Sequence, residues 1–102
     1  MFSVNGIKWK EVFVPSDADC LEGAVAVCDN NTKTIYVREG LRDEDLRKVL
    51  SHELTHAAMF SYDIHLSLKQ EELLADLLAT YGEEIIIKAN ELFERIKRKR
   101  EA

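Results

Sequence analysis

The chain has 102 residues, of which 46% are hydrophobic and 32% are charged, and its formal net charge is −5. This length and balance indicate a single globular domain, residues 1–102, and argue against intrinsic disorder. No apolar run reaches the roughly 18–20 residues that span a bilayer, and the negative charge argues against a general nucleic-acid binder. The first residues do not resemble a secretory signal peptide, so we expect a cytoplasmic protein with no membrane partner.

Strand patterns occupy the first third of the chain. Residues 7–14 mix polar residues with β-forming ones, residues 23–28 are a short apolar run, and residues 34–37 are β-branched and aromatic; turn-forming residues separate the last two segments. That spacing predicts a hairpin, and the three segments together predict a small antiparallel three-stranded sheet. The two cysteines, Cys20 and Cys28, are expected to be free thiols, because no secretion signal points to an oxidising compartment.

A first helix is predicted from near Asp43 to about Phe60. Asp43, Glu44 and Asp45 can supply a cap and negative charge for its first turn. Apolar residues then recur at helical spacing up to the end of the segment. The sequence therefore passes from a β part to a helical part shortly after residue 40.

A second helix is predicted from near Leu68, because Ser67 and Gln70 form a capping-box pattern. Gly82 is expected to kink or split it, and a further helical stretch is expected over residues 83–98. The expected core face consists of apolar residues at helical spacing, namely Leu73, Leu74, Leu77, Leu78, Tyr81 and Ile85.

The most informative pattern is His52-Glu53-Leu54-Thr55-His56, on the segment predicted as the first helix. Residues four apart on a helix lie on one face, so both imidazoles can bind the same metal ion. Two histidine nitrogens are half of a tetrahedral zinc shell. Glu53, beside the metal, can take a proton from a water that the metal activates, as the general base of a metallopeptidase does.

A catalytic zinc site needs a third protein ligand, and the candidates are Glu72, Glu71 and His65. Alanines three and seven positions after Glu72 would let the second helix lie close to the first, which favours Glu72. Asp76, one turn after Glu72, can accept the second N–H of a liganding histidine.

With Glu72-Leu73-Leu74-Ala75-Asp76 after the first motif, the chain resembles the gluzincin metallopeptidases. Their thermolysin-like members pair HExxH with ExxxD on a second helix. The second element is also similar to that of the ImmA/IrrE-type peptidases of prophages and mobile elements, and the size resembles the single-domain minigluzincins. The resemblance covers roughly residues 22–80. It implies a minimal zincin-like α+β fold with a small sheet, an active-site helix, a glutamate helix and a C-terminal helical extension. It also implies a zinc-dependent peptidase with one Zn²⁺ per chain.

A peptide or protein substrate is expected to lie extended along an edge strand of the sheet. The resemblance implies that this edge strand is formed by Thr34, Ile35, Tyr36 and Val37. The Tyr and His donors that stabilise the oxyanion in larger gluzincins have no clear match. Tyr62 and His65, just after the first helix, are the candidates for that role here.

Two other classes of function remain open. One is a metal-stabilised regulatory module with little or no proteolysis, which the ImmA/IrrE-type resemblance allows because such proteins act on or alongside transcriptional repressors. The other is nucleic-acid interaction through the basic C-terminal tail, residues 88–102. An apolar stripe through Phe93 and Ile96 on that tail can cover the cleft, dock a regulatory protein or pair with a second copy. If the stripe covers the cleft, the isolated peptidase would be latent. If it pairs with a second copy, the chain would be a dimer rather than a monomer.

Overall fold

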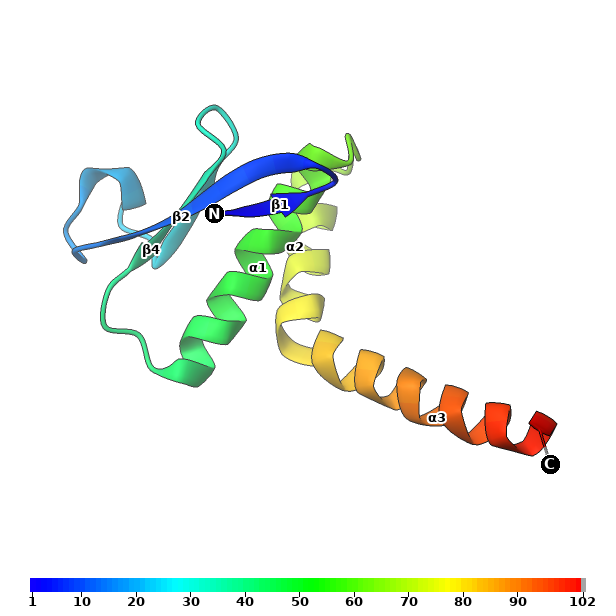
Figure 1. Ribbon diagram of the computed structural model, residues 1–102. Coiled ribbons are helices and arrows are strands. Elements are labelled where there is room, and N and C mark those ends of the chain that lie inside the picture. Colours follow the sequence, from blue (N-terminus) through cyan, green and yellow to red (C-terminus); the bar gives the residue numbers. More distant parts are fainter. Residues whose placement is uncertain (102) are drawn as a thin grey trace.

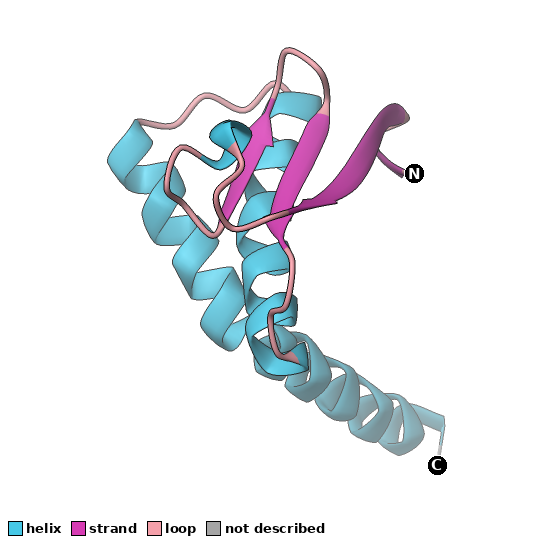
Figure 2. Ribbon diagram, turned by 90° about the vertical axis from the view of Figure 1, so that its left-hand side faces the viewer, coloured by secondary structure: helices cyan, strands magenta, loops and turns pink. Residues whose placement is uncertain are grey.

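The computed structural model describes residues 1–101 as a four-stranded sheet followed by three helices (Figure 1). The sheet has the order β1-β2-β4-β3, and helix α1 lies across one of its faces (Figure 2). The α+β class is therefore confirmed. In chain order the elements are β1 (Phe2–Val4), β2 (Ile7–Val14), a 3-10 turn (Asp19–Leu21), β3 (Ala26–Asp29), β4 (Thr34–Arg38), α1 (Asp43–Ser61), α2 (Leu68–Leu77), a π-helical turn (Leu78–Gly82) and α3 (Glu83–Glu101).

The expectation of a three-stranded antiparallel sheet is wrong in its details. β2 runs parallel to β4, while β1 pairs antiparallel with β2 and β3 pairs antiparallel with β4. The additional strand β1 turns into β2 through Asn5 and Gly6, whose φ angles of 50° and 75° are both positive. Asn-Gly favours this two-residue turn because both residues tolerate a positive φ.

The predicted edge strand is also wrong, because β4 lies in the middle of the sheet. β4 pairs with β2 on one side and with β3 on the other, and its Thr34, Ile35 and Val37 are buried. A strand rich in β-branched residues is most stable where both faces and both edges are covered. Within residues 1–101 the outer strands are β1 and β3, and β3 has the more extensive contact with α1.

The core lies between the sheet and α1, and residues of α1 both before and after the HExxH motif contribute to it. Trp9, Ile35, Val37 and Ala57 form its buried centre. The indole N–H of Trp9 donates to the hydroxyl of Ser61 over 2.8 Å. A hydrogen bond of this kind between buried groups determines how the helix is oriented on the sheet.

The two predicted helix starts are confirmed, with one change at α1. α1 begins at Asp43, but Arg42 occupies its N-cap position without a side-chain hydrogen bond, so the three acidic residues serve only its first turn. α2 begins with the expected capping box. The Ser67 hydroxyl accepts the Gln70 N–H over 3.1 Å, and the Gln70 side chain accepts the Ser67 N–H over 3.1 Å.

The core face expected for the second helix is wrong except at Leu74, which is partly buried. Leu73, Tyr81 and Ile85 are 69%, 57% and 53% exposed, whereas Ala75 and Gly82 are buried. Small residues rather than leucines therefore bring this helix close to α1. The π-helical turn lies where a kink at Gly82 was expected, and beyond it α3 projects away from the body (Figure 1). No helix within residues 1–101 combines the length and apolar character needed to cross a bilayer.

Candidate metal centre

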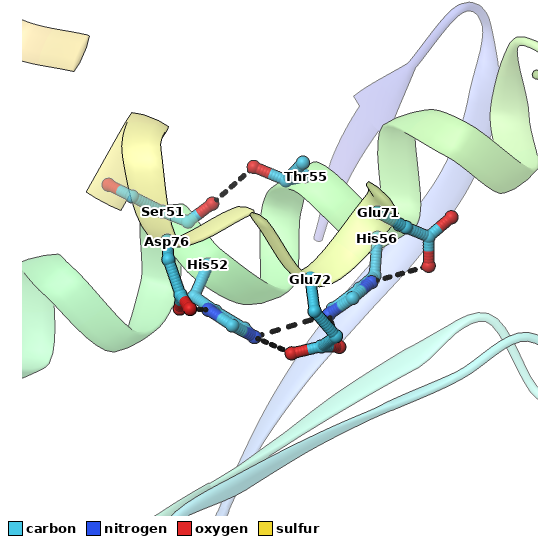
Figure 3. Close-up of polar contacts among 7 residues, drawn as sticks. All are labelled: Ser51, His52, Thr55, His56, Glu71, Glu72 and Asp76. Atoms are coloured by element: carbon cyan, nitrogen blue, oxygen red, sulfur yellow. Dashed lines mark hydrogen bonds and ion pairs between the residues drawn. The ribbon is translucent and has the colours of Figure 1, made fainter. Parts of the chain in front are cut away.

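Two histidines of α1 and one glutamate of α2 converge on one point (Figure 3). The Nε2 atoms of His52 and His56 are 3.2 Å apart. The Glu72 carboxylate places Oε2 3.3 Å from His52 Nε2 and Oε1 2.9 Å from His56 Nε2. Of the three candidates for the third ligand, Glu72 is the one that joins the pair.

The spacing of these atoms fits a small divalent cation. Three ligand atoms about 2.0–2.1 Å from one ion in tetrahedral directions lie about 3.3 Å from one another. The two Nε2 atoms are 3.2 Å apart, and the Glu72 oxygens Oε1 and Oε2 lie 2.9 Å and 3.3 Å from Nε2 of His56 and of His52, so the separations are close to that value. Two imidazole nitrogens and one carboxylate oxygen are also a donor set that suits zinc.

Carboxylates on α2 hold the other nitrogen of each imidazole (Figure 3). Asp76 Oδ1 lies 3.1 Å from His52 Nδ1, and Glu71 Oε2 lies 2.7 Å from His56 Nδ1. A carboxylate accepts a hydrogen bond, so Nδ1 of each ring can donate to it, which leaves Nε2 of each ring as the nitrogen that can bind a metal ion.

The two supporting carboxylates differ in burial. The Glu71 side chain is 16% exposed, whereas the Asp76 side chain is 69% exposed. Glu71 therefore has the same role for His56 that was expected of Asp76 for His52, with a shorter contact and a less exposed side chain. The sequence had presented Glu71 only as an alternative third ligand. Its position directly before Glu72 in the first turn of α2 was the available signal.

Two cavities flank the three candidate ligands, and both are lined by Ala26 of β3 together with His52 and Glu53 of α1. One has a volume of about 410 Å³ and extends toward Lys48 and the π-helical turn. The other has a volume of about 370 Å³ and extends past Cys28 toward the start of α2. A shallow groove therefore follows the free edge of β3 on both sides of the ligands.

Glu53 lies in this groove and is only 8% exposed. Burial raises the pKa of its carboxyl, and the neighbouring imidazoles of His56 and His52 oppose that rise. A carboxyl whose pKa is raised toward neutrality suits proton transfer near pH 7.

Burial also raises the pKa of the Cys28 thiol to about 12, with Glu53 and Glu71 adding to the effect. Cys28 is therefore a protonated thiol near neutrality rather than a nucleophile.

The structure does not bring Tyr62 and His65 into the groove. Neither residue lines the two cavities, Tyr62 is 54% exposed, and His65 pairs with Asp63 over 2.9 Å at the surface. Lys48 and Thr80 line the larger cavity instead, and the sequence did not single them out.

Comparisons with protein-family models, curated proteins and solved structures found no match to this chain. The functional interpretation therefore rests on the site's own residues and geometry.

Proposed function

We propose that this protein binds one zinc ion through His52, His56 and Glu72 and hydrolyses peptide bonds. The observation that carries the proposal is the convergence of three ligand atoms from two helices beside a buried Glu53. The two carboxylates behind the imidazoles add support, because second-shell acceptors of this kind orient the histidines of zinc sites. Histidines and a glutamate that are close together by chance are not expected to have a carboxylate beside the second nitrogen of each imidazole.

Each residue then has a chemical role. The bound zinc would act as a Lewis acid on the scissile carbonyl and on the attacking water. Glu53 accepts the proton of that water and passes it to the leaving amine, which is general base catalysis followed by general acid catalysis. His52, His56 and Glu72 keep their positions through this step, because Asp76 and Glu71 hold the imidazoles from behind.

The proposed substrate is an extended peptide or protein segment that adds to β3 in the cytoplasm. β3 pairs with β4 on one side, and its other edge faces the groove that holds the ligands. An extended peptide adds to such an edge through backbone hydrogen bonds. The two cavities would then receive side chains from either side of the scissile bond.

A metal-stabilised regulatory module with little or no proteolysis is the second candidate function. It is favoured by the positions of Tyr62 and His65, which leave the groove without either expected oxyanion donor. Such donors contribute strongly to acyl-transfer rates, so a site that lacks them can retain the metal and cleave slowly.

The first experiment measures metal content by elemental mass spectrometry after reconstitution with zinc. The wild type should hold about one zinc per chain, and Glu72→Ala should lose it. Glu94→Ala, on the exposed face of α3, is the matched control and should keep the metal. An absence of zinc in the wild type would refute the proposed function.

Hydrolysis is then tested with a library of fluorogenic peptides. Glu53→Gln should keep the metal and lose cleavage by a factor of about 10²–10⁴, the usual contribution of a positioned base. Zinc binding with no cleavage by the wild type would favour the regulatory module.

A further inference from the structure

Helix α3 carries an apolar stripe that no other part of the described chain covers. No residue of α3 is buried. The stripe consists of Ile85, Ile86, Ala89, Leu92, Phe93 and Ile96, which recur every three or four residues and so share one face of the helix. Its five large side chains are 49–61% exposed.

The size of the stripe matches the requirement of a small dimer interface. Five large side chains that are about half exposed present about 500 Å² of apolar surface per chain. Two such faces together contribute about 1,000 Å², near the lower limit for a specific protein interface. Apolar patches larger than a few hundred Å² are uncommon on monomers.

Charge is divided along the same helix. Residues 83–94 contain four acidic and one basic side chain, so their net charge is −3, whereas residues 95–101 contain five basic and one acidic side chain, so theirs is +4. In a parallel pair of α3 helices, like charges would face each other. In an antiparallel pair, the acidic half of each helix lies beside the basic half of the other.

We propose that α3 pairs antiparallel with α3 of a second copy of this chain, around a two-fold axis near residue 90. Residues equally far from position 90 on either side then face each other. Ile86 packs against Phe93 and Ile96 of the second copy, and Glu83 lies beside Lys97 of the second copy, because both of these charged residues flank the stripe and lie seven residues from position 90. Such an interface is isologous, so every contact occurs twice. The proposal does not depend on the metal site.

The surroundings of the stripe favour a second copy over a lipid surface or a nucleic acid. Glu83, Glu84, Glu91 and Glu94 lie on the same helix and would be repelled by phosphates, whereas they complement the basic end of a second α3. At its start the helix also borders a groove of about 600 Å³, to which Leu54 of α1 contributes apolar surface. The apolar surface therefore continues from α3 onto the body, where the end of a second helix can pack.

The first test measures molar mass by light scattering for the full chain, from low micromolar to several hundred micromolar concentration. We expect twice the chain mass of 11.7 kDa at the upper end. Phe93→Glu should be monomeric throughout. Phe13→Glu is the matched control, because Phe13 of β2 is 49% exposed and far from α3 in the sequence, and this variant should remain dimeric. A monomeric wild type, or a dimer that survives Phe93→Glu, would overturn the proposal.

The second test determines the orientation of the two helices. Glu83→Arg and Lys97→Glu should each weaken the dimer about tenfold, because each turns two attractions into two repulsions. An equimolar mixture of the two variants should form a heterodimer about as stable as the wild-type dimer. Single variants as tight as the wild type would refute the antiparallel arrangement. Binding of the monomer to phosphatidylserine vesicles through α3, without dimers, would assign the face to lipid and also overturn the proposal.

Discussion

Replacement of Glu71 by alanine should weaken zinc binding more than the same replacement of Asp76. Both carboxylates accept the Nδ1–H of a proposed metal ligand, but they do so in different surroundings. The Glu71 contact to His56 is 2.7 Å long with a side chain 16% exposed, whereas the Asp76 contact to His52 is 3.1 Å long with a side chain 69% exposed. The structure therefore predicts that Glu71 contributes more than Asp76 to zinc binding, although both residues have the same role.

The expected magnitudes follow from that difference in burial. A hydrogen bond to a charged group contributes about 1.5–3 kcal/mol when it is protected from water. At 1.4 kcal/mol for each tenfold change, Glu71→Ala should raise the dissociation constant for zinc about 10- to 100-fold. Water screens the exposed pair, so Asp76→Ala should raise the constant by about tenfold at most.

The assay is competition with a chromogenic zinc chelator at fixed pH and ionic strength. Glu71→Gln is the matched variant, because its amide oxygen still accepts the Nδ1–H but carries no charge, and its affinity should fall between those of the wild type and Glu71→Ala. Circular dichroism of each metal-free variant establishes that the fold is intact. Equal effects of Glu71→Ala and Asp76→Ala, or a larger effect of Asp76→Ala, would show that burial does not decide these contributions.

Three further predictions concern the groove and the core. Metal-loaded Glu53→Gln should bind a peptide substrate with nearly unchanged affinity, measured by fluorescence anisotropy; a lost affinity would mean that Glu53 positions the substrate. At pH 8 a thiol with a pKa of about 12 is ionised in only about one molecule in 10⁴. The Cys20→Ser variant, whose one thiol is Cys28, should therefore react with Ellman's reagent at least about 100-fold more slowly than Cys28→Ser, and equal rates would contradict the raised pKa of the partly buried Cys28 thiol. Ser61→Ala leaves the buried indole N–H of Trp9 without its acceptor, so it should lower the free energy of unfolding by about 1–3 kcal/mol in urea titrations; an unchanged midpoint would mean that water replaces the hydroxyl.

Local patterns in the sequence predicted the parts of the structure that depend on neighbouring residues. The capping box at Ser67 and Gln70 determines the start of α2 through two hydrogen bonds within three residues. The four-residue spacing of His52 and His56 places both imidazoles on one side of α1, because that side is set by the helical repeat alone. The Asn5-Gly6 turn between β1 and β2 belongs to the same class, and its signal was present although no strand was predicted before it.

Contacts between distant segments decided the rest. Which strand lies at the edge depends on how β2, β3 and β4 pair across the sheet, and no local preference distinguishes a parallel from an antiparallel neighbour. Likewise, the leucine-rich side of the second helix is as periodic as a buried face, yet α1 approaches the side of Ala75 and Gly82, where small residues permit close packing.

The residues of the candidate site fall into the same two groups, those that the sequence identified and those that required the tertiary structure. His52, Glu53 and His56 could be identified from the sequence because one helix carries all three. The partner of His56, the free edge of β3 and the positions of Tyr62 and His65 relative to the ligands required the tertiary structure. Local hydrogen bonds and the helical repeat are encoded in adjacent residues, whereas the docking of α2 against α1 depends on the shape of both surfaces after each element has formed.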